Sequence, residues 1–103
     1  MFRVSFAFVA FAAGSLVLGV GMGIYMGVQQ DFALAPVHAH LNLLGWVSLA
    51  IFGLVYRAFP ELAFPRAATL HLALSGAGAV LFPVGLYLEI FQERGELIAV
   101  AED

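Results

Sequence analysis

The chain has 103 residues, of which 63% are hydrophobic and only 11% are charged, and its mean hydropathy is +1.01. This composition lies outside the range of soluble globular domains and is typical of an integral membrane protein. The four basic residues are all arginine and the net charge is −3, which excludes a nucleic-acid-binding surface. Because the chain has no cysteine, disulfides, thiolate metal ligands and covalent c-type haem attachment are excluded as well.

Three stretches of low charge are long enough to cross a bilayer, which requires roughly 18 or more apolar residues. They cover residues 4–28, 37–59 and 67–91, and they are separated by a polar turn at 29–31 and a proline- and arginine-containing turn at 59–66. We therefore predict an all-α integral membrane bundle of three transmembrane helices, forming one domain over residues 1–103. The expected location is the lipid bilayer of the bacterial inner membrane, as a multi-pass protein.

The first stretch is predicted to be a retained helix and not a cleaved signal peptide. It is longer than a signal-peptide apolar region of roughly 7 to 15 residues, and Pro36 would directly follow the small residues of a cleavage site. Ser15, Gly19, Gly23 and Gly27 recur along this helix every four residues. Small residues at such a spacing let helices approach closely in lipid, so this ridge is expected to contact another helix of the chain or of a second copy.

The third stretch contains a block of small residues at 75–79, followed by Pro83. The small residues permit close packing, and the proline is expected to kink the helix. Glu89 lies close to the end of the stretch, where a carboxylate can reach headgroups and water.

The orientation is predicted from the arginines, because short cytoplasmic loops are enriched in basic residues. Arg3, Arg57 and Arg66 fall on one side of the membrane and Arg94 falls on the other. The N-terminus and the second turn are therefore expected in the cytoplasm, and the first turn outside. The acidic tail is expected outside too, and consists of Glu93, Glu96, Glu102 and Asp103.

Two of the three histidines, His38 and His40, stand one residue apart at the start of the second stretch. On an α-helix each residue advances by about 100°, so these imidazoles point to opposite sides and are poorly placed to chelate one ion together. They could serve two different centres, or one centre and one hydrogen-bond partner. Hydrated histidines without a ligand are the plain alternative at a helix start near the interface.

The helical wheel separates the two sides of this helix. The side of His38 is predicted to carry Asn42, Gly45, Leu49 and Gly53. Its two glycines form a notch that suits either a flat macrocycle or a closely packed helix. The side of His40 is predicted to be an aliphatic wall of Leu44, Val47, Ile51 and Leu54.

Ligating imidazoles usually donate their second N–H to a polar partner. The candidates for this role are Asn42, one turn below His38, and the polar turn residues Gln29, Gln30 and Asp31. The third histidine, His71, is expected of order 25 Å away, because the second and third helices are antiparallel. We expect His71 to be a packing or interfacial residue, with a second haem on the cytoplasmic side as the alternative.

The segment PVHAHLNLLGWVSLAIFGLVYRAFP, residues 36–60, resembles the His-x-His helix of the haem-copper oxidase superfamily, the catalytic subunit of cytochrome c oxidases and nitric oxide reductases. It is more similar still to small membrane proteins described as cytochrome c oxidase subunit I-like. Leu41, Gly45, Trp46 and Val47 are in register with the motif of that group. The rest of the chain shares only its hydrophobic outline.

In the large oxidases the two histidines of this motif are axial ligands of two haems. The resemblance therefore implies that His38 and His40 bind the iron of haem b, with Asn42, Gly45 and Trp46 beside the cofactor. Three helices with three histidines cannot hold the copper site and the opposing ligand helix of the large subunits, so a complete dioxygen-reducing centre in one chain is excluded. A homo-oligomer, such as a trimer, would let one copy's His38 face another's His40 across a haem.

The function implied is haem binding for electron transfer or for binding a diatomic gas, NO or O2. Bis-histidine ligation would favour the first and a vacant sixth position the second. One alternative is a cofactor-free accessory or structural subunit of a respiratory or photosynthetic membrane complex, packing through the glycine ridge. Another is direct copper or zinc binding by the histidine pair between subunits. Whether the chain is an enzyme is left open.

Overall fold

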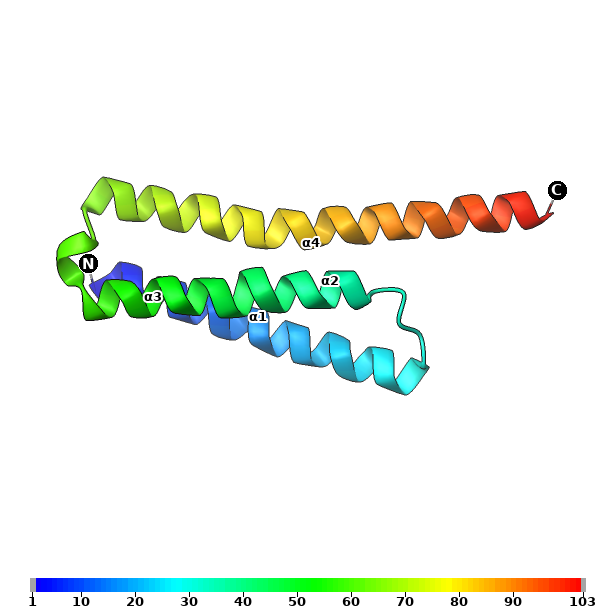
Figure 1. Cartoon of the computed structure of the whole chain (residues 1–103), viewed down its shortest axis with the longest axis horizontal. Coiled ribbons are helices and arrows are strands. Elements are labelled where there is room, and N and C mark those ends of the chain that lie inside the picture. Colours follow the sequence, from blue (N-terminus) through cyan, green and yellow to red (C-terminus); the bar gives the residue numbers. More distant parts are fainter. Residues whose placement is uncertain (1, 103) are drawn as a thin grey trace.

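The computed structural model describes residues 2–102, with side chains from residue 4 onward, and Figure 1 shows their arrangement. Helix α1 spans Phe2–Gln29. A second long helix is built from α2 (Ala35–His40), the π-helix η1 (Leu41–Ser48) and α3 (Leu49–Ala58). The 3₁₀ turn η2 (Pro60–Leu62) leads into α4 (Pro65–Glu102).

The prediction of an all-α chain with three membrane-spanning helices is confirmed. Three helices in the described chain are long and apolar enough to cross a membrane. The first two agree with the predicted ranges to within two residues at each end. The third prediction was wrong at its end, because α4 continues eleven residues past 91, to Glu102. The charges of this segment end the apolar run, but Glu and Arg are good helix formers and do not end a helix.

Helix α4 also passes through Pro83 without interruption. Proline removes one backbone hydrogen bond, and it is tolerated here within a gently curved helix, visible in Figure 1, instead of the expected kink. Pro83 is buried, as are Ala68, Gly76 and Ala79 on the same helix. Small or compact residues therefore form most of the surface through which α4 packs on the other two helices.

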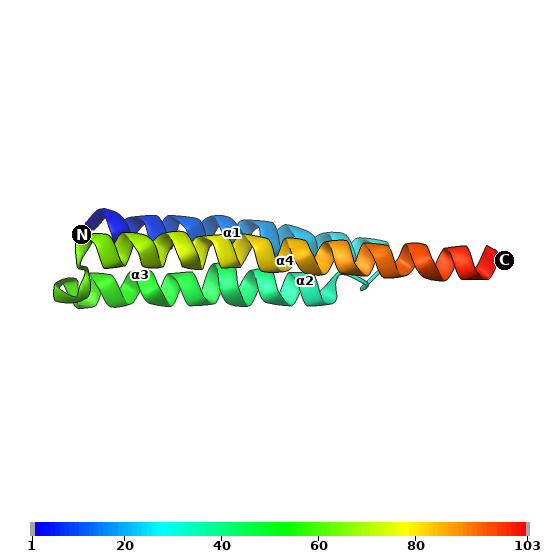
Figure 2. The same ribbon diagram turned by 90° about the horizontal axis from the view of Figure 1, so that it is seen from above.

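Helices α1 and α2–η1–α3 run antiparallel and cross, while α4 lies along both of them (Figures 1 and 2). They meet most tightly in the half of the bundle that holds the N-terminus of α1. There Phe8, Ala12, Leu49 and Ala79 form the buried core, with Trp46 among the side chains packed around it. In the other half, α1 diverges from α4 (Figure 1).

The contact between α1 and α3 depends on the absence of side-chain atoms at Gly53. A Cβ placed there would lie 2.7 Å from Val9 Cγ2 and 3.0 Å from both Phe8 Cβ and the Ser5 carbonyl oxygen. At this closest point the buried Ser5 hydroxyl donates a hydrogen bond of 2.8 Å to the Gly53 carbonyl oxygen. Close approach thus brings a polar group on one helix to an acceptor on its neighbour, as small-residue interfaces in lipid do.

The second helix contains an unusually long π segment, η1, over Leu41–Ser48. A π turn closes with an i→i+5 bond and so holds about one residue more than an α turn. As a result, residues spaced by four stay on the same side: His40 contacts Phe82 of α4, and Phe52 and Tyr56 both contact His71 of α4. On an ideal α-helix, His40 and Tyr56 would be separated by about 160° around the axis.

The first turn of the bundle, after α1, is closed by Gln30, which has a positive φ of 54°. The Asp31 N–H donates to the Met26 carbonyl oxygen at 3.2 Å, which is the long hydrogen bond of a Schellman motif. Arg94 of α4 then donates to Asp31 at 3.0 Å and forms an ion pair with it. The turn is therefore attached to the outer part of α4.

We expect Gly53→Ala to destabilise the bundle by about 1–3 kcal/mol, because the added methyl group must displace atoms near the α1 backbone. Gly21→Ala is the matched control, since a Cβ at Gly21 meets no atom within 4 Å. It is expected to be neutral or stabilising by up to about 1 kcal/mol, through helix propensity. Thermal or denaturant unfolding in detergent, followed by circular dichroism, measures both; equal effects of the two variants would contradict the tight contact.

Because a π turn holds about one residue more than an α turn, η1 should tolerate the loss of one residue. Deleting Leu43, which is exposed, should let η1 become α-helical while the two ends of the helix keep their present faces. Deleting the exposed Val17 of α1 offers no such compensation, because it rotates Gly19 and Gly23 by about 100° away from their contacts. The expected result is a folded protein with a clear unfolding transition for the first deletion and loss of that transition for the second.

Candidate functional site

His38 lies in the seam between α2 and α1. A Cβ added to Gly23 would lie 3.1 Å from His38 Cε1, so the imidazole rests directly on the α1 backbone. The Asn42 amide nitrogen is 3.3 Å from each ring nitrogen of His38 and can donate to whichever one is unprotonated. Asn42 in turn fills the space over Gly19, where a Cβ would overlap its Oδ1 atom.

The predicted members of the His38 side are therefore together. Gly45 packs on Ser15, whose Cβ and Oγ would both lie 2.6 Å from an added Cβ. Leu49 is buried and Gly53 meets α1 as described above. The glycine notch, which suited either a macrocycle or a close helix, is filled by α1 of the same chain.

His40 is in a different environment, on the side of α4. Its ring centroid lies 4.8 Å from that of Phe82, and its Nδ1 is 2.7 Å from the Pro36 carbonyl oxygen. A carbonyl can only accept, so Nδ1 carries the proton of this hydrogen bond. In the neutral imidazole, Nε2 therefore keeps its lone pair, which is the form that binds a metal.

The predicted aliphatic wall beside His40 was wrong in its membership. Leu44 is half-buried against the core, as expected for a residue on the α4 side. Val47, Ile51 and Leu54 instead face outward and are 39–60% exposed. The wheel assumed 100° per residue throughout, whereas the wider turns of η1 place every fourth residue on the α4 side.

The remaining residues predicted for the site pack against the core or close the first turn. Trp46 is half-buried and packs against the core formed around Phe8 and Leu49. Gln30 and Asp31 do not act as partners of the imidazoles: the Gln30 amide donates to the Gly27 carbonyl, and Asp31 accepts from the Ala33 N–H and from Arg94. Asn42 alone, of the polar candidates, is placed against His38.

His71 belongs to a separate cluster at the other end of the bundle. Its Nδ1 is hydrogen-bonded to the Tyr56 hydroxyl at 2.8 Å, and its ring lies 5.1 Å from Phe8 and 4.6 Å from Phe52 between ring centroids. The imidazole thus joins all three helices through ring contacts and one polar bond. Its role as a packing residue was anticipated, whereas its partner Tyr56 was not.

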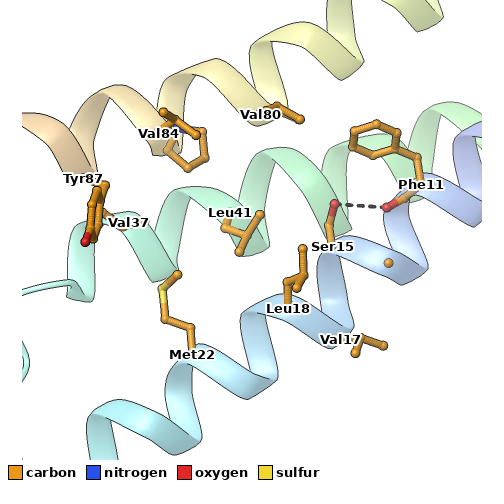
Figure 3. Close-up of a pocket in the computed structure, with 13 residues that line it drawn as sticks. Phe11, Ser15, Val17, Leu18, Met22, Val37, Leu41, Val80, Val84 and Tyr87 are labelled. Atoms are coloured by element: carbon orange, nitrogen blue, oxygen red, sulfur yellow. Dashed lines mark hydrogen bonds between the residues drawn. The ribbon is translucent and has the colours of Figure 1, made fainter.

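A long apolar groove lies between α1 and α4, with α2 and η1 as its floor (Figure 3). Its volume is about 830 Å³. The lining residues come from three helices and are Phe11, Gly14, Ser15, Val17, Leu18, Met22, Val37, Leu41, Ala79, Val80, Pro83, Val84 and Tyr87. No histidine lines this groove, and within residues 2–102 no group of three or more histidine or acidic side chains could hold a metal ion.

The sequence patterns gave no indication of the groove. Its wall residues are ordinary apolar side chains. They surround one groove because α1 diverges from α4.

Comparison of the chain with family models, with curated proteins and with solved structures finds no match.

The ion pair between Asp31 and Arg94 predicts a pH-dependent stability. The hydrogen bond from the Ala33 N–H, and then that from Arg94, lower the pKa of the Asp31 carboxyl group. A lowered pKa in the folded state means that this contribution to stability is present above the ordinary pKa of the group and is lost as the pH falls through the folded-state pKa.

The matched variant is Asp31→Asn, which keeps an oxygen acceptor for Ala33 but removes the charge. We expect the wild type to have the higher unfolding temperature at pH 7 and the two proteins to converge in strong acid. The effect is expected to be small, because the pair is about half-exposed and screened by solvent. A difference in unfolding temperature that grows as the pH falls would contradict this prediction.

Proposed function

We propose that this chain is a multi-pass protein of the bacterial inner membrane that binds b-type haem through His40, for electron transfer or for binding a diatomic gas. The observation that carries the proposal is the hydrogen bond from His40 Nδ1 to the Pro36 carbonyl. It holds the ring orientation and leaves Nε2 as the free donor atom, an arrangement typical of metal-ligating histidines. The positive-inside rule supports a cytoplasmic N-terminus.

His38 is not proposed as a haem ligand, although the resemblance implied that role for it. Its ring is packed against Gly23 and bonded by Asn42, so it could reach a haem only if α1 moved away. We therefore propose that His40 alone would hold the haem iron, and that His38, Asn42 and Gly45 hold α1 against the helix that carries His40. Trp46 supports the same helix from the core.

The surface beside His40 is aromatic and suits a macrocycle. The ring of Phe82 on α4 lies next to the imidazole, with 4.8 Å between the ring centroids, and Phe82 is half-exposed. His38 and His71 are held in packing contacts within the bundle, so a second protein ligand would come from another copy, as in a trimer or other homo-oligomer, or from another subunit. Bound haem would supply a one-electron iron couple, and the presence or absence of a second protein ligand would decide between electron transfer and gas binding.

The test is the reduced-minus-oxidised absorption spectrum of protein purified from haem-replete cells. We expect a b-type spectrum in the wild type, its loss in His40→Ala, and its retention in the matched variants His38→Ala and His71→Ala. Carbon monoxide added to the reduced protein then separates the two roles, because it shifts the Soret band only where the sixth position is open or weakly held. A wild type without a Soret band would sink the proposal.

The second candidate is a cofactor-free accessory subunit of a respiratory or photosynthetic complex. It is favoured by the packing of His38, which explains one of the two histidines without any ligand, and by the many large apolar side chains exposed on all three helices. In that case the purified protein has no haem spectrum, and other membrane subunits co-purify with it equally well when His40 is alanine. Copper or zinc held between subunits is a weaker option, which metal analysis of the same preparation would detect.

A further inference from the structure

The apolar groove between α1 and α4 has the dimensions of a site for hydrocarbon chains. It follows α1 from Phe11 to Met22, a length of about 16 Å at 1.5 Å per residue. Its volume is about 830 Å³ and its lining is almost wholly apolar. Flexible hydrocarbon chains can follow such a groove along its length, and the groups at its end decide which occupant fits best.

The two ends of the groove differ in polarity. Its lining is apolar except for Ser15, whose hydroxyl is already bonded to the Phe11 carbonyl, and Tyr87 at the end towards the Asp31 turn (Figure 3). Tyrosine is enriched where helices leave the hydrocarbon region. A chain lying in the groove would thus have its free end in the bundle centre and its polar end near Tyr87.

Charged groups follow at the level where a headgroup would lie. Arg94 stands seven residues after Tyr87, two turns along the same face of α4 and about 10 Å further from the bilayer centre. Its guanidinium group is paired with the Asp31 carboxylate at 3.0 Å, and both side chains remain about half-exposed. A cation and an anion side by side are complementary to a zwitterionic headgroup, with phosphate at Arg94 and ammonium at Asp31.

We infer that this groove binds one zwitterionic phospholipid, with its acyl chains between α1, η1 and α4 and its headgroup at the Asp31–Arg94 pair. An anionic headgroup would bring a second negative charge to Asp31 without a cation to balance it, so it binds less well. The site is separate from His40, and the inference holds whether or not the chain binds haem.

The experiment is native mass spectrometry of the detergent-purified full chain after delipidation. The probe is an equimolar mixture of phosphatidylethanolamine and phosphatidylglycerol with identical acyl chains. We expect one bound lipid per chain and a preference for phosphatidylethanolamine of about threefold, the scale of an exposed charge interaction. Retention of no lipid, or a preference for phosphatidylglycerol, would overturn the inference.

Two variants fill the groove from opposite walls: Gly14→Phe on α1 and Val80→Phe on α4. An added Cβ at Gly14 meets nothing within 4 Å, and the same is true of Gly21 on α1, which does not line the groove and serves as the control as Gly21→Phe. Both groove variants should lose lipid while the control retains it. Binding in the groove variants that equals the wild type overturns the site.

The headgroup assignment is tested by Asp31→Asn. This variant should still bind one lipid but should no longer distinguish the two headgroups. An unchanged preference overturns the role of the ion pair. A wild-type dimer that becomes a monomer in Gly14→Phe would instead assign the groove to a second copy, which also overturns the inference.

Discussion

The structure depends on the close approach of α1 to the second long helix. Apolar burial gives little reward for helix pairing inside a bilayer, so the pairing must come from dispersion contacts and from polar bonds made possible at short range. The contact between these two helices contains both. Because Gly53 has no side chain, Ser5 comes close enough to donate its hydrogen bond, and because Gly23 has none, the imidazole of His38 packs on the α1 backbone. The positions of His40, of the core and of the groove walls all follow from how this pair of helices crosses.

The π segment η1 then decides which residues face which neighbour. It keeps His40 and Tyr56 on the same side, so that α4 contacts both ends of the helix through rings. The histidine pair lies just before η1 in α2, where the i, i+2 spacing on an α-helix gives the two imidazoles different environments, one packed and one with a free ring nitrogen. A π segment of this kind costs hydrogen-bond quality, and short π segments often occur at functional sites; η1 directly follows His40, the proposed haem ligand.

Sequence patterns predicted the three spans, the contents of the His38 side and the contacts of Ser15, Gly19 and Gly23 on the α1 ridge, because small residues and apolar runs report directly on helix contacts. Gly27, the last residue of the predicted ridge, is exposed, and a Cβ added there would meet nothing within 4 Å. Sequence patterns could not decide whether a macrocycle or a helix occupied the glycine notch, since both need the same missing side chains. The π segment has no compositional signature in Leu41–Ser48, so the wheel misplaced Val47, Ile51 and Leu54. The pairing of Asp31 with Arg94 joins residues 63 positions apart, and only the path of α4 reveals it.

Helix α4 is longer than a bilayer is thick. Its 38 residues extend over about 57 Å, whereas a bilayer with its headgroups is about 40–45 Å thick. The last turns of α4, which follow the pairing of Arg94 with Asp31, are therefore long enough to extend beyond the headgroups. Each residue added to or removed from α4 after Arg94 would turn the side chains beyond it by about 100° around the helix axis.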